Sequence, residues 1–171
     1  MLEIVTFPND ILKRKTNPVK KVDAEIKEII SQMKETMYKN DGIGLAANQV
    51  NIPLSIMVID TTSREEEHEK FQGVLINPTL VEKAGEIKFK EGCLSFPGLQ
   101  VEVLRAKEVI IKAVNEFEEE VMLHLRELPA IVFQHEFDHL NGITFLDRLG
   151  GLKKRLALEK YNKSLKEKVG A

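Results

Sequence analysis

The segment from Pro129 to Leu140 constrains this chain most, because it predicts a helix with two histidines on one face. Its letters are PAIVFQHEFDHL, with His135 and His139 four residues apart. On an α-helix, positions i and i+4 lie one turn apart on the same face, so both imidazoles can reach a single metal ion. Glu136 projects about a hundred degrees round the helix from His135, close enough to handle a proton without ligating. The alternative is two solvated or core histidines on an ordinary helix.

Two histidines leave a hydrolytic metal site short of a ligand, since such sites usually have three protein ligands and a water. The remaining candidates are His68 in a charged loop, His124 in a predicted strand, and the single cysteine, Cys93. A lone cysteine is commonly a small buried hydrophobe. Cys93, however, lies in a glycine-flanked turn between two predicted strands, where another group can approach the backbone closely. A Cys-His-His set would favour softer divalent ions such as Fe(II) or Zn.

A third segment with unusual composition runs from Gly42 to Gln49 and reads GIGLAANQ. Two glycines and a pair of alanines indicate a backbone that another group approaches closely. The spacing matches neither of the glycine-rich phosphate-binding patterns, GxGxxG and GxxxxGK. The alternative is a helix terminator followed by small packing residues.

The pattern of apolar residues predicts an α+β fold. Helical spacing predicts a short helix over Asn9–Lys15, a longer one that Asp23 caps and that extends to Asn40, and a last one over Leu152–Val169. We expect antiparallel or mixed β-sheets packed around a central HExxH helix, with helices at the N- and C-terminal ends. The predicted strands are Leu54–Asp60, Val74–Asn77, Leu80–Phe89, Leu99–Val103, Val109–Val114 and Glu119–Leu125. The apolar side of the last helix is predicted to hold Leu156, Leu158, Tyr161 and Leu165.

Composition excludes several classes of protein. Hydrophobic residues make up 43% and charged residues 30% of the 171 residues, which excludes a disordered chain. No unbroken apolar run is long enough to span a membrane, and no basic segment followed by an apolar run indicates a secretory signal. A single cysteine cannot form an internal disulfide. The expectation is a cytoplasmic protein with no membrane partner.

The charge of the chain is unevenly distributed. The net charge of −2 gives no reason to expect DNA as a ligand. From Gly150 onwards, however, the net charge is +5, which leaves −7 for the rest. The basic residues of this segment are Lys153, Lys154, Arg155, Lys160, Lys163, Lys166 and Lys168.

Taken together, GIGLAANQ, EGCLS and QHEFDHLNG resemble the peptide deformylase family, in that family's order and at its usual separations. The opening FPNDILKRKTNPV is similar as well, so the resemblance covers nearly the whole chain and implies one catalytic domain over residues 1–171. It implies a metal-dependent hydrolase that removes the N-formyl group from the N-terminal formylmethionine of newly synthesised proteins, releasing formate. The implied metal ligands are Cys93, His135 and His139. The implied cofactor is one divalent ion, natively Fe(II), with Zn, Ni or Co also able to bind.

The resemblance also assigns roles to residues outside the metal ligands. Glu136 matches the general acid/base, and Gln49 and the backbone N–H of Leu94 match the two donors that stabilise the oxyanion. Glu91 and Arg105 match a buried pair that braces the cysteine loop. The methionine side chain of the substrate needs an apolar slot, and the candidates for its walls are Ile43, Gly44, Leu128, Ile131 and Val132.

Three positions depart from the family pattern. Many members carry glycine where this chain has Glu127, and no proline where it has Pro129, so the entrance to the metal-binding helix differs. Gln100 replaces an arginine found in some members near the substrate backbone.

The expected partners are formylmethionyl nascent peptides and, through the basic C-terminal helix, the ribosome. Two other functions stay open from the sequence. One is a metallopeptidase or other amidase that uses the same Cys-His-His centre. The other is a metal-binding or ribosome-interacting protein without catalysis, which would have no need for both Glu136 and Gln49.

Overall fold

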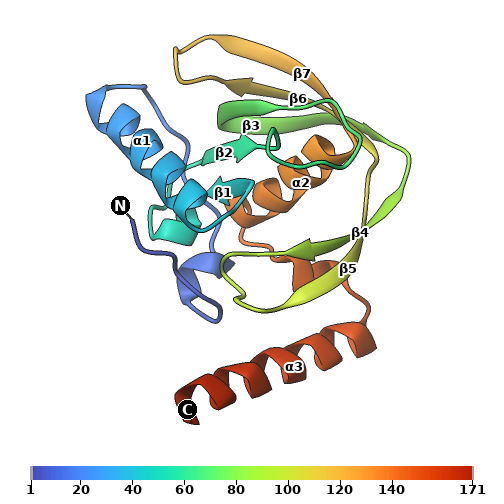
Figure 1. Cartoon of the computed structure of the whole chain (residues 1–171). Helices are drawn as coiled ribbons and strands as arrows, with labels where there is room; N and C mark the ends of the chain where they lie inside the picture. The colour runs from blue at the N-terminus through green and yellow to red at the C-terminus, as the bar shows by residue number, and fades with distance from the viewer. Residues whose placement is uncertain (1, 171) are drawn as a thin grey trace.

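A five-stranded antiparallel sheet and a two-stranded hairpin lie on either side of a central helix, α2 (Leu128–Leu140), in the computed structural model (Figure 1). The structure describes residues 2–170, with side chains as far as residue 167. The sheet has the order β1 (Gly44–Ala46), β2 (Ile56–Asp60), β3 (Gln72–Ala84), β6 (Glu108–Val114) and β7 (Glu120–Arg126). The hairpin pairs β4 (Ile87–Gly92) with β5 (Gln100–Arg105).

The N-terminal third supplies one side of the core. A 3-10 turn, η1 (Asp10–Lys13), stands where a short helix was predicted, and α1 (Ala24–Lys39) follows. The Asp23 side chain accepts a hydrogen bond from Ile26 N, so the predicted N-cap is confirmed. The buried face of α1 packs against β1 and β2 (Figure 1). Its buried residues are Ile26, Ile30, Met33, Thr36 and Met37.

The predicted division between Val74–Asn77 and Leu80–Phe89 is wrong. The strand β3 continues through Pro78, and Phe89 belongs to β4 beyond the turn. The pairing register with β6 shifts between Ile76 and Thr79, so the proline lies at an irregularity where its missing N–H costs no ladder bond. The chain reverses direction at Gly85. Its φ of +70° lies in the left-handed region, which glycine adopts without strain because it has no Cβ.

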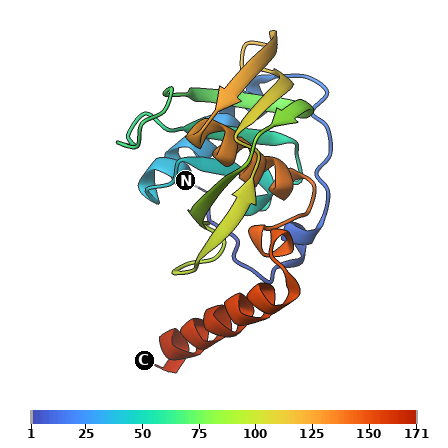
Figure 2. The same ribbon diagram turned by 90° about the vertical axis from the view of Figure 1, so that its right-hand side faces the viewer.

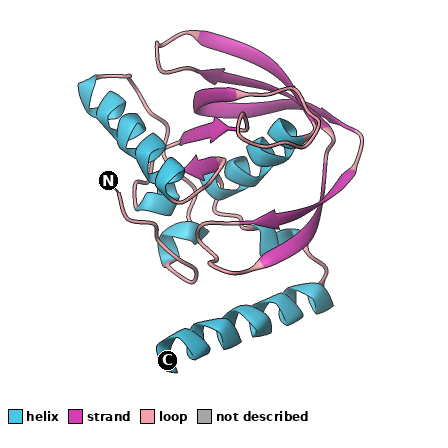
Figure 3. Cartoon of the chain, viewed as in Figure 1, coloured by secondary structure: helices cyan, strands magenta, loops and turns pink. Residues whose placement is uncertain are grey.

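The helix α2 begins at Leu128 and lies between the five-stranded sheet and the hairpin (Figure 3). Eleven of its 13 residues are buried. It packs against β1, β2 and β7, and Pro129 lies in its first turn as predicted. Glu127 stands at the N-cap with φ 57° and ψ −130°, a conformation that favours glycine.

The last helix, α3 (Gly151–Gly170), follows the 3-10 turn η3 (Phe145–Arg148) and lies at one end of the molecule, away from the five-stranded sheet (Figure 1, Figure 2). Tyr161 anchors it: the ring packs on Phe96 and the hydroxyl donates to the Phe7 carbonyl oxygen at 3.0 Å.

One predicted packing residue of α3 is wrong. Leu158 and Leu165 are half-buried on the Tyr161 side, but Leu156 is 52% exposed and Ala157 is buried instead. Five helical positions turn about 140° beyond a full revolution, so Leu156 and Tyr161 cannot share a face. No helix within the described residues is long and apolar enough to cross a membrane.

Candidate metal centre

Three potential ligand atoms converge where the loop after β4 meets α2. The Nε2 atom of His139 lies 3.3 Å from Cys93 Sγ and 3.3 Å from His135 Nε2, and the three ligand atoms all lie within 4.8 Å of one another. In a tetrahedral site with metal–sulfur bonds near 2.3 Å and metal–nitrogen bonds near 2.0–2.1 Å, neighbouring donors are about 3.3–3.6 Å apart. The observed spacing therefore fits one metal ion held by Cys93, His135 and His139.

His135 is oriented from behind by the pair predicted at the cysteine loop. Its Nδ1 lies 2.8 Å from Glu91 Oε1, while Arg105 donates to both oxygens of Glu91 at 2.8 and 2.9 Å. Burial alone would raise the pKa of Glu91, but hydrogen bonds from Arg105 and His135 outweigh it and lower that pKa. An ionised Glu91 accepts a hydrogen bond from His135 Nδ1–H. The proton is then on Nδ1, which leaves the Nε2 lone pair of His135 free to bind a metal.

His139 is fully buried, and burial holds its pKa well below the usual value. A neutral imidazole is the form that a metal ligand requires. Asn48, which the sequence analysis did not single out as a site residue, donates from Nδ2 to the His139 carbonyl oxygen at 2.5 Å. Asn48 therefore ties the end of α2 to the turn η2 (Ala47–Val50), immediately after β1.

Glu136 stands beside the three ligand atoms in a closely packed environment. Burial raises the pKa of its carboxyl to about 7, and its Oε1 has no hydrogen-bond partner within the described part of the chain. A Cβ on Gly44 would come within 2.6 Å of both Glu136 Oε2 and a methyl group of Val132. Glycine at position 44 therefore makes room for the carboxylate, as the close approach predicted for this segment requires.

The side-chain amide of Gln49 is held in one orientation. Its Oε1 accepts from Ala46 N at 2.9 Å, so Nε2 points toward Ser95 Oγ at 3.1 Å and Cys93 Sγ at 3.5 Å. Ser95 is buried completely and was missed in the sequence analysis, although it lies inside the EGCLS motif. Within residues 2–170, the backbone N–H of Leu94 has no acceptor. The Gln49 amide and the Leu94 N–H are thus two donors beside the candidate ligand atoms, placed to donate hydrogen bonds to an oxygen atom there.

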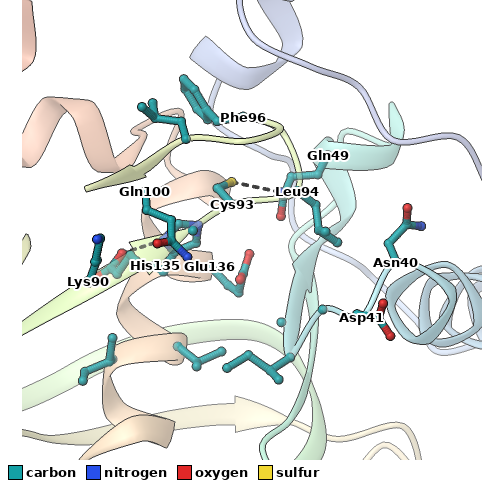
Figure 4. A pocket seen from close by; sticks show the side chains of 18 of the residues that line it. Asn40, Asp41, Gln49, Lys90, Cys93, Leu94, Phe96, Gln100, His135 and Glu136 are labelled. Atoms are coloured by element: carbon teal, nitrogen blue, oxygen red, sulfur yellow. Dashed lines mark hydrogen bonds and ion pairs between the residues drawn. The ribbon is translucent and has the colours of Figure 1, made fainter. Parts of the chain in front are cut away.

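A pocket of about 770 Å³ opens onto this cluster (Figure 4). Figure 4 shows Gln49, Cys93, His135 and Glu136 gathered in it, with Gln100 and Lys90 on the hairpin side. All five predicted wall residues line the pocket: Ile43, Gly44, Leu128, Ile131 and Val132. Phe89 and Leu94 add further apolar wall that sequence reasoning did not assign to the slot.

The two remaining histidines lie away from the cluster. His68 is in the loop after β2, with its ring nitrogens near the carbonyl oxygens of Glu66 and Thr61. His124 is on the exposed face of β7 and pairs with Glu108. Neither is in the group of residues that can hold a metal, and Cys93 takes that place.

Comparisons with known proteins decide which family contains this site. The family model described as polypeptide deformylase matches residues 1–155. This chain belongs to the peptide deformylase family. A peptide deformylase of Aquifex aeolicus is 55% identical over 166 residues, which are 97% of this chain and 98% of the relative.

Solved structures of the family share the whole fold. A peptide deformylase from Legionella pneumophila has a TM-score of 0.89 at 36% identity and covers 99% of this chain and 98% of its own. One from Ehrlichia chaffeensis, in complex with actinonin, has a TM-score of 0.88 at 35% identity and covers 96% and 97%. The predicted α+β class and the predicted family are confirmed.

The family establishes the reaction. The enzyme is a metal-dependent hydrolase that removes the N-formyl group from the N-terminal formylmethionine of newly synthesised proteins and releases formate. Of the three functions open from the sequence, the deformylase is the one supported.

Proposed function

We propose that Cys93, His135 and His139 hold the metal of this deformylase and that Glu136, Gln49 and the Leu94 N–H carry out the remaining chemistry. One observation supports this proposal most directly: three ligand atoms converge beside a buried carboxylate with an unpaired oxygen, at the end of an apolar pocket. The lining of the pocket comes from the segment before β1, from the hairpin and from α2, which supports a single catalytic domain over residues 1–171.

The protein groups around the metal divide the work of amide hydrolysis. A bound divalent ion supplies Lewis acidity, which lowers the pKa of water enough for attack near neutral pH. Glu136 takes the proton of the attacking water at its free oxygen and returns it to the leaving nitrogen, because an amide nitrogen cannot leave as an anion.

Attack on the formyl carbon creates an oxyanion that needs hydrogen-bond donors. The Gln49 Nε2 group and the Leu94 N–H are fixed beside Cys93 before substrate arrives, so they need little reorganisation during the reaction. Loss of one such donor typically raises the barrier by about 2.7–4 kcal/mol.

The wall formed by Ile43, Leu128, Ile131 and Val132 takes the methionine side chain. Leu128, Ile131 and Val132 are buried residues of α2, and Ile43 lines the same pocket. Burial of a methionine side chain contributes about 1.5–3 kcal/mol. That energy selects formylmethionine over formyl peptides with a short first side chain.

We propose Fe(II) as the native ion, with Zn, Ni or Co able to replace it. A thiolate with two imidazoles suits these softer divalent ions better than Mg or Ca. If iron is native, activity purified without oxygen falls in air through oxidation of the iron or of Cys93, and the nickel form persists. Equal half-lives in air for the two forms would contradict the iron assignment.

The experiment for the reaction compares formyl-Met-Ala with acetyl-Met-Ala and with unblocked Met-Ala, using anaerobically purified enzyme loaded with Fe(II). We expect release of formate from the first peptide and no comparable cleavage of the others. Actinonin should compete with formyl-Met-Ala, as the complex in the Ehrlichia relative suggests. Comparable cleavage of the acetyl peptide would support a general amidase and overturn the assignment.

We further propose that α3 docks on ribosomal RNA and that the protein acts in the cytoplasm, where its substrate emerges. Lys160, Lys163 and Lys166 are exposed on α3 while its Tyr161 side packs on the domain, so docking and packing are compatible. Lys168 belongs to the same basic segment, but its side chain lies outside the described residues.

Phosphate contacts make such docking dependent on salt. The double variant Lys163→Gln with Lys166→Gln should weaken co-sedimentation with ribosomes at low salt and leave deformylation of a short peptide unchanged. The matched control replaces the exposed Lys20 and Lys21, which lie outside α3, by glutamine. Equal ribosome binding by the two variants would leave α3 as a packing element alone.

A further inference from the structure

A chain of alternating charges runs from His135 to the turn before α3. Glu91 contacts His135 Nδ1, and Arg105 donates to both Glu91 oxygens. The Nη1 group of Arg105 then donates to Asp138 Oδ2 at 2.6 Å. Arg148, in η3, closes the chain with two bonds to Asp138, Nη2 to Oδ1 at 2.6 Å and Nε to Oδ2 at 3.0 Å.

The exposure of the side chains in this chain of charges changes sharply at its last member, Arg148. The side chains of Glu91, Arg105 and Asp138 are between 3% and 6% exposed, whereas that of Arg148 is 47% exposed. Arg148 is thus the member that can be replaced without leaving a hole in the core. Its two-pronged contact with a buried carboxylate is nevertheless the geometry in which a guanidinium binds most strongly.

The charge count explains what Arg148 does. Two guanidinium groups and two carboxylates balance one another when Arg148 is present. Without it, Arg105 alone must serve both Glu91 and Asp138 in a site with little water, where an unpaired carboxylate is costly. Arg105 would then shift toward Asp138, and its two hydrogen bonds to Glu91 would weaken.

We propose that Arg148 is a positioning residue of the metal centre. By neutralising Asp138 it lets Arg105 keep two bonds on Glu91, and Glu91 in turn fixes the ring of His135. The inference rests on the proposed function, in which His135 is a metal ligand. Arg148 is neither one of the candidate ligand residues nor part of the pocket lining, and it lies three residues before α3, far along the sequence from the cysteine loop.

The test measures metal affinity directly, by metal retention against a graded chelator. Loss of a group that directly contacts a ligating histidine typically costs 10–100-fold in metal affinity. Arg148 acts through two intermediates, so we expect Arg148→Met to weaken binding by about five- to tenfold, with KM for formyl-Met-Ala unchanged when the site is loaded. Arg148→Lys keeps the charge but not the two-pronged contact and should fall between Arg148→Met and wild type.

Two comparisons separate positioning from general stability. Lys154 pairs with Asp147 at 3.0 Å in the same junction but outside this chain of charges, so Lys154→Gln should leave metal affinity unchanged. In an Asp138→Asn background, Arg148→Met should have little further effect, because the two residues act through one contact.

The outcomes are distinct. Wild-type metal affinity in Arg148→Met, whatever its melting temperature, would overturn the inference, as would additive effects with Asp138→Asn. If Arg148→Met does not fold, Arg148→Gln is read by the same criterion. Cys93→Ser, measured in parallel, distinguishes failure of the inference about Arg148 from failure of the proposed ligand set. If Cys93→Ser too retains wild-type metal affinity, the proposed ligand set itself is wrong.

Discussion

At the scale of single residues, the aim of the Gln49 amide depends on Ser95. Ser95 Oγ is the closer of the two acceptors of Gln49 Nε2, and the serine is fully buried. Ser95→Ala keeps the packing but removes one of the hydrogen bonds that orient the amide. We expect kcat to fall about tenfold with KM unchanged, less than the 10²–10³-fold typical for removing an oxyanion donor. Steady-state kinetics with formyl-Met-Ala measures this, and an unchanged kcat would show that the orientation of Gln49 does not depend on Ser95.

Glu127 is a residue whose side chain conflicts with its backbone. Its φ of 57° and ψ of −130° cost a residue with a Cβ about 1–3 kcal/mol, part of which glycine regains. Glu127→Gly should therefore stabilise the protein by about 1 kcal/mol and raise Tm by about 2–4 °C. Glu127→Gln is the matched control, since it removes only the 3.6 Å pairing with Lys107 and keeps the strain. A lower Tm for Glu127→Gly than for Glu127→Gln would contradict this account.

At the scale of elements, α3 offers two neighbouring positions with opposite environments. Ala157 is buried against the cluster that contains Tyr161, whereas Leu156 is mostly exposed. Ala157→Lys should lower the free energy of unfolding by about 1–3 kcal/mol, because the larger charged side chain must displace packed neighbours. Leu156→Lys should change it by less than about 0.5 kcal/mol. Thermal unfolding of the two variants compares them, and a reversed order would mean that α3 packs by its other face.

The elements differ in how well the sequence predicts them. The helix α2, the N-cap Asp23 and most strands follow from local periodicity and capping, which depend on near neighbours. The short strand β1 and the turn η2 lie in a glycine- and alanine-rich segment that carries no period. The structure of β1 is set by its pairing with β2, and η2 is held by the hydrogen bond from Asn48 to His139; both contacts join segments that are distant in the sequence.

The residues of the site also divide into those that local sequence motifs predict and those that depend on contacts between distant segments. The three proposed metal ligands and Glu136 lie in compact motifs, and the resemblance to the family implies the roles proposed for the other residues. Asn48, Ser95 and Arg148 were missed as site residues because their contacts join segments far apart in the sequence: Asn48 with His139, Ser95 with Gln49, and Arg148 with the buried charges. Spacing along the chain carries no signal for such contacts.

At the scale of the whole molecule, the metal would join two parts of the structure. Cys93 follows the hairpin strand β4, and the histidines lie on α2 (Figure 1). Metal bound only by the folded state stabilises it by about 4.1 kcal/mol at a free concentration a thousand times Kd. Removal of the metal by a chelator should therefore lower Tm by about 8–16 °C. Equal melting temperatures for the loaded and the stripped protein would contradict a metal that bridges these parts.

The most direct measurement of the central claim is the metal content and deformylase activity of Cys93→Ser, purified without oxygen beside wild type. A hydroxyl resists deprotonation and is a harder ligand, so we expect the variant to lose most of its metal and its release of formate from formyl-Met-Ala. Glu136→Gln is the control for a site residue that is not a ligand: it should keep its metal and lose roughly 10²–10⁴-fold in kcat. Wild-type metal content and activity in Cys93→Ser would contradict the three-ligand centre on which this account rests.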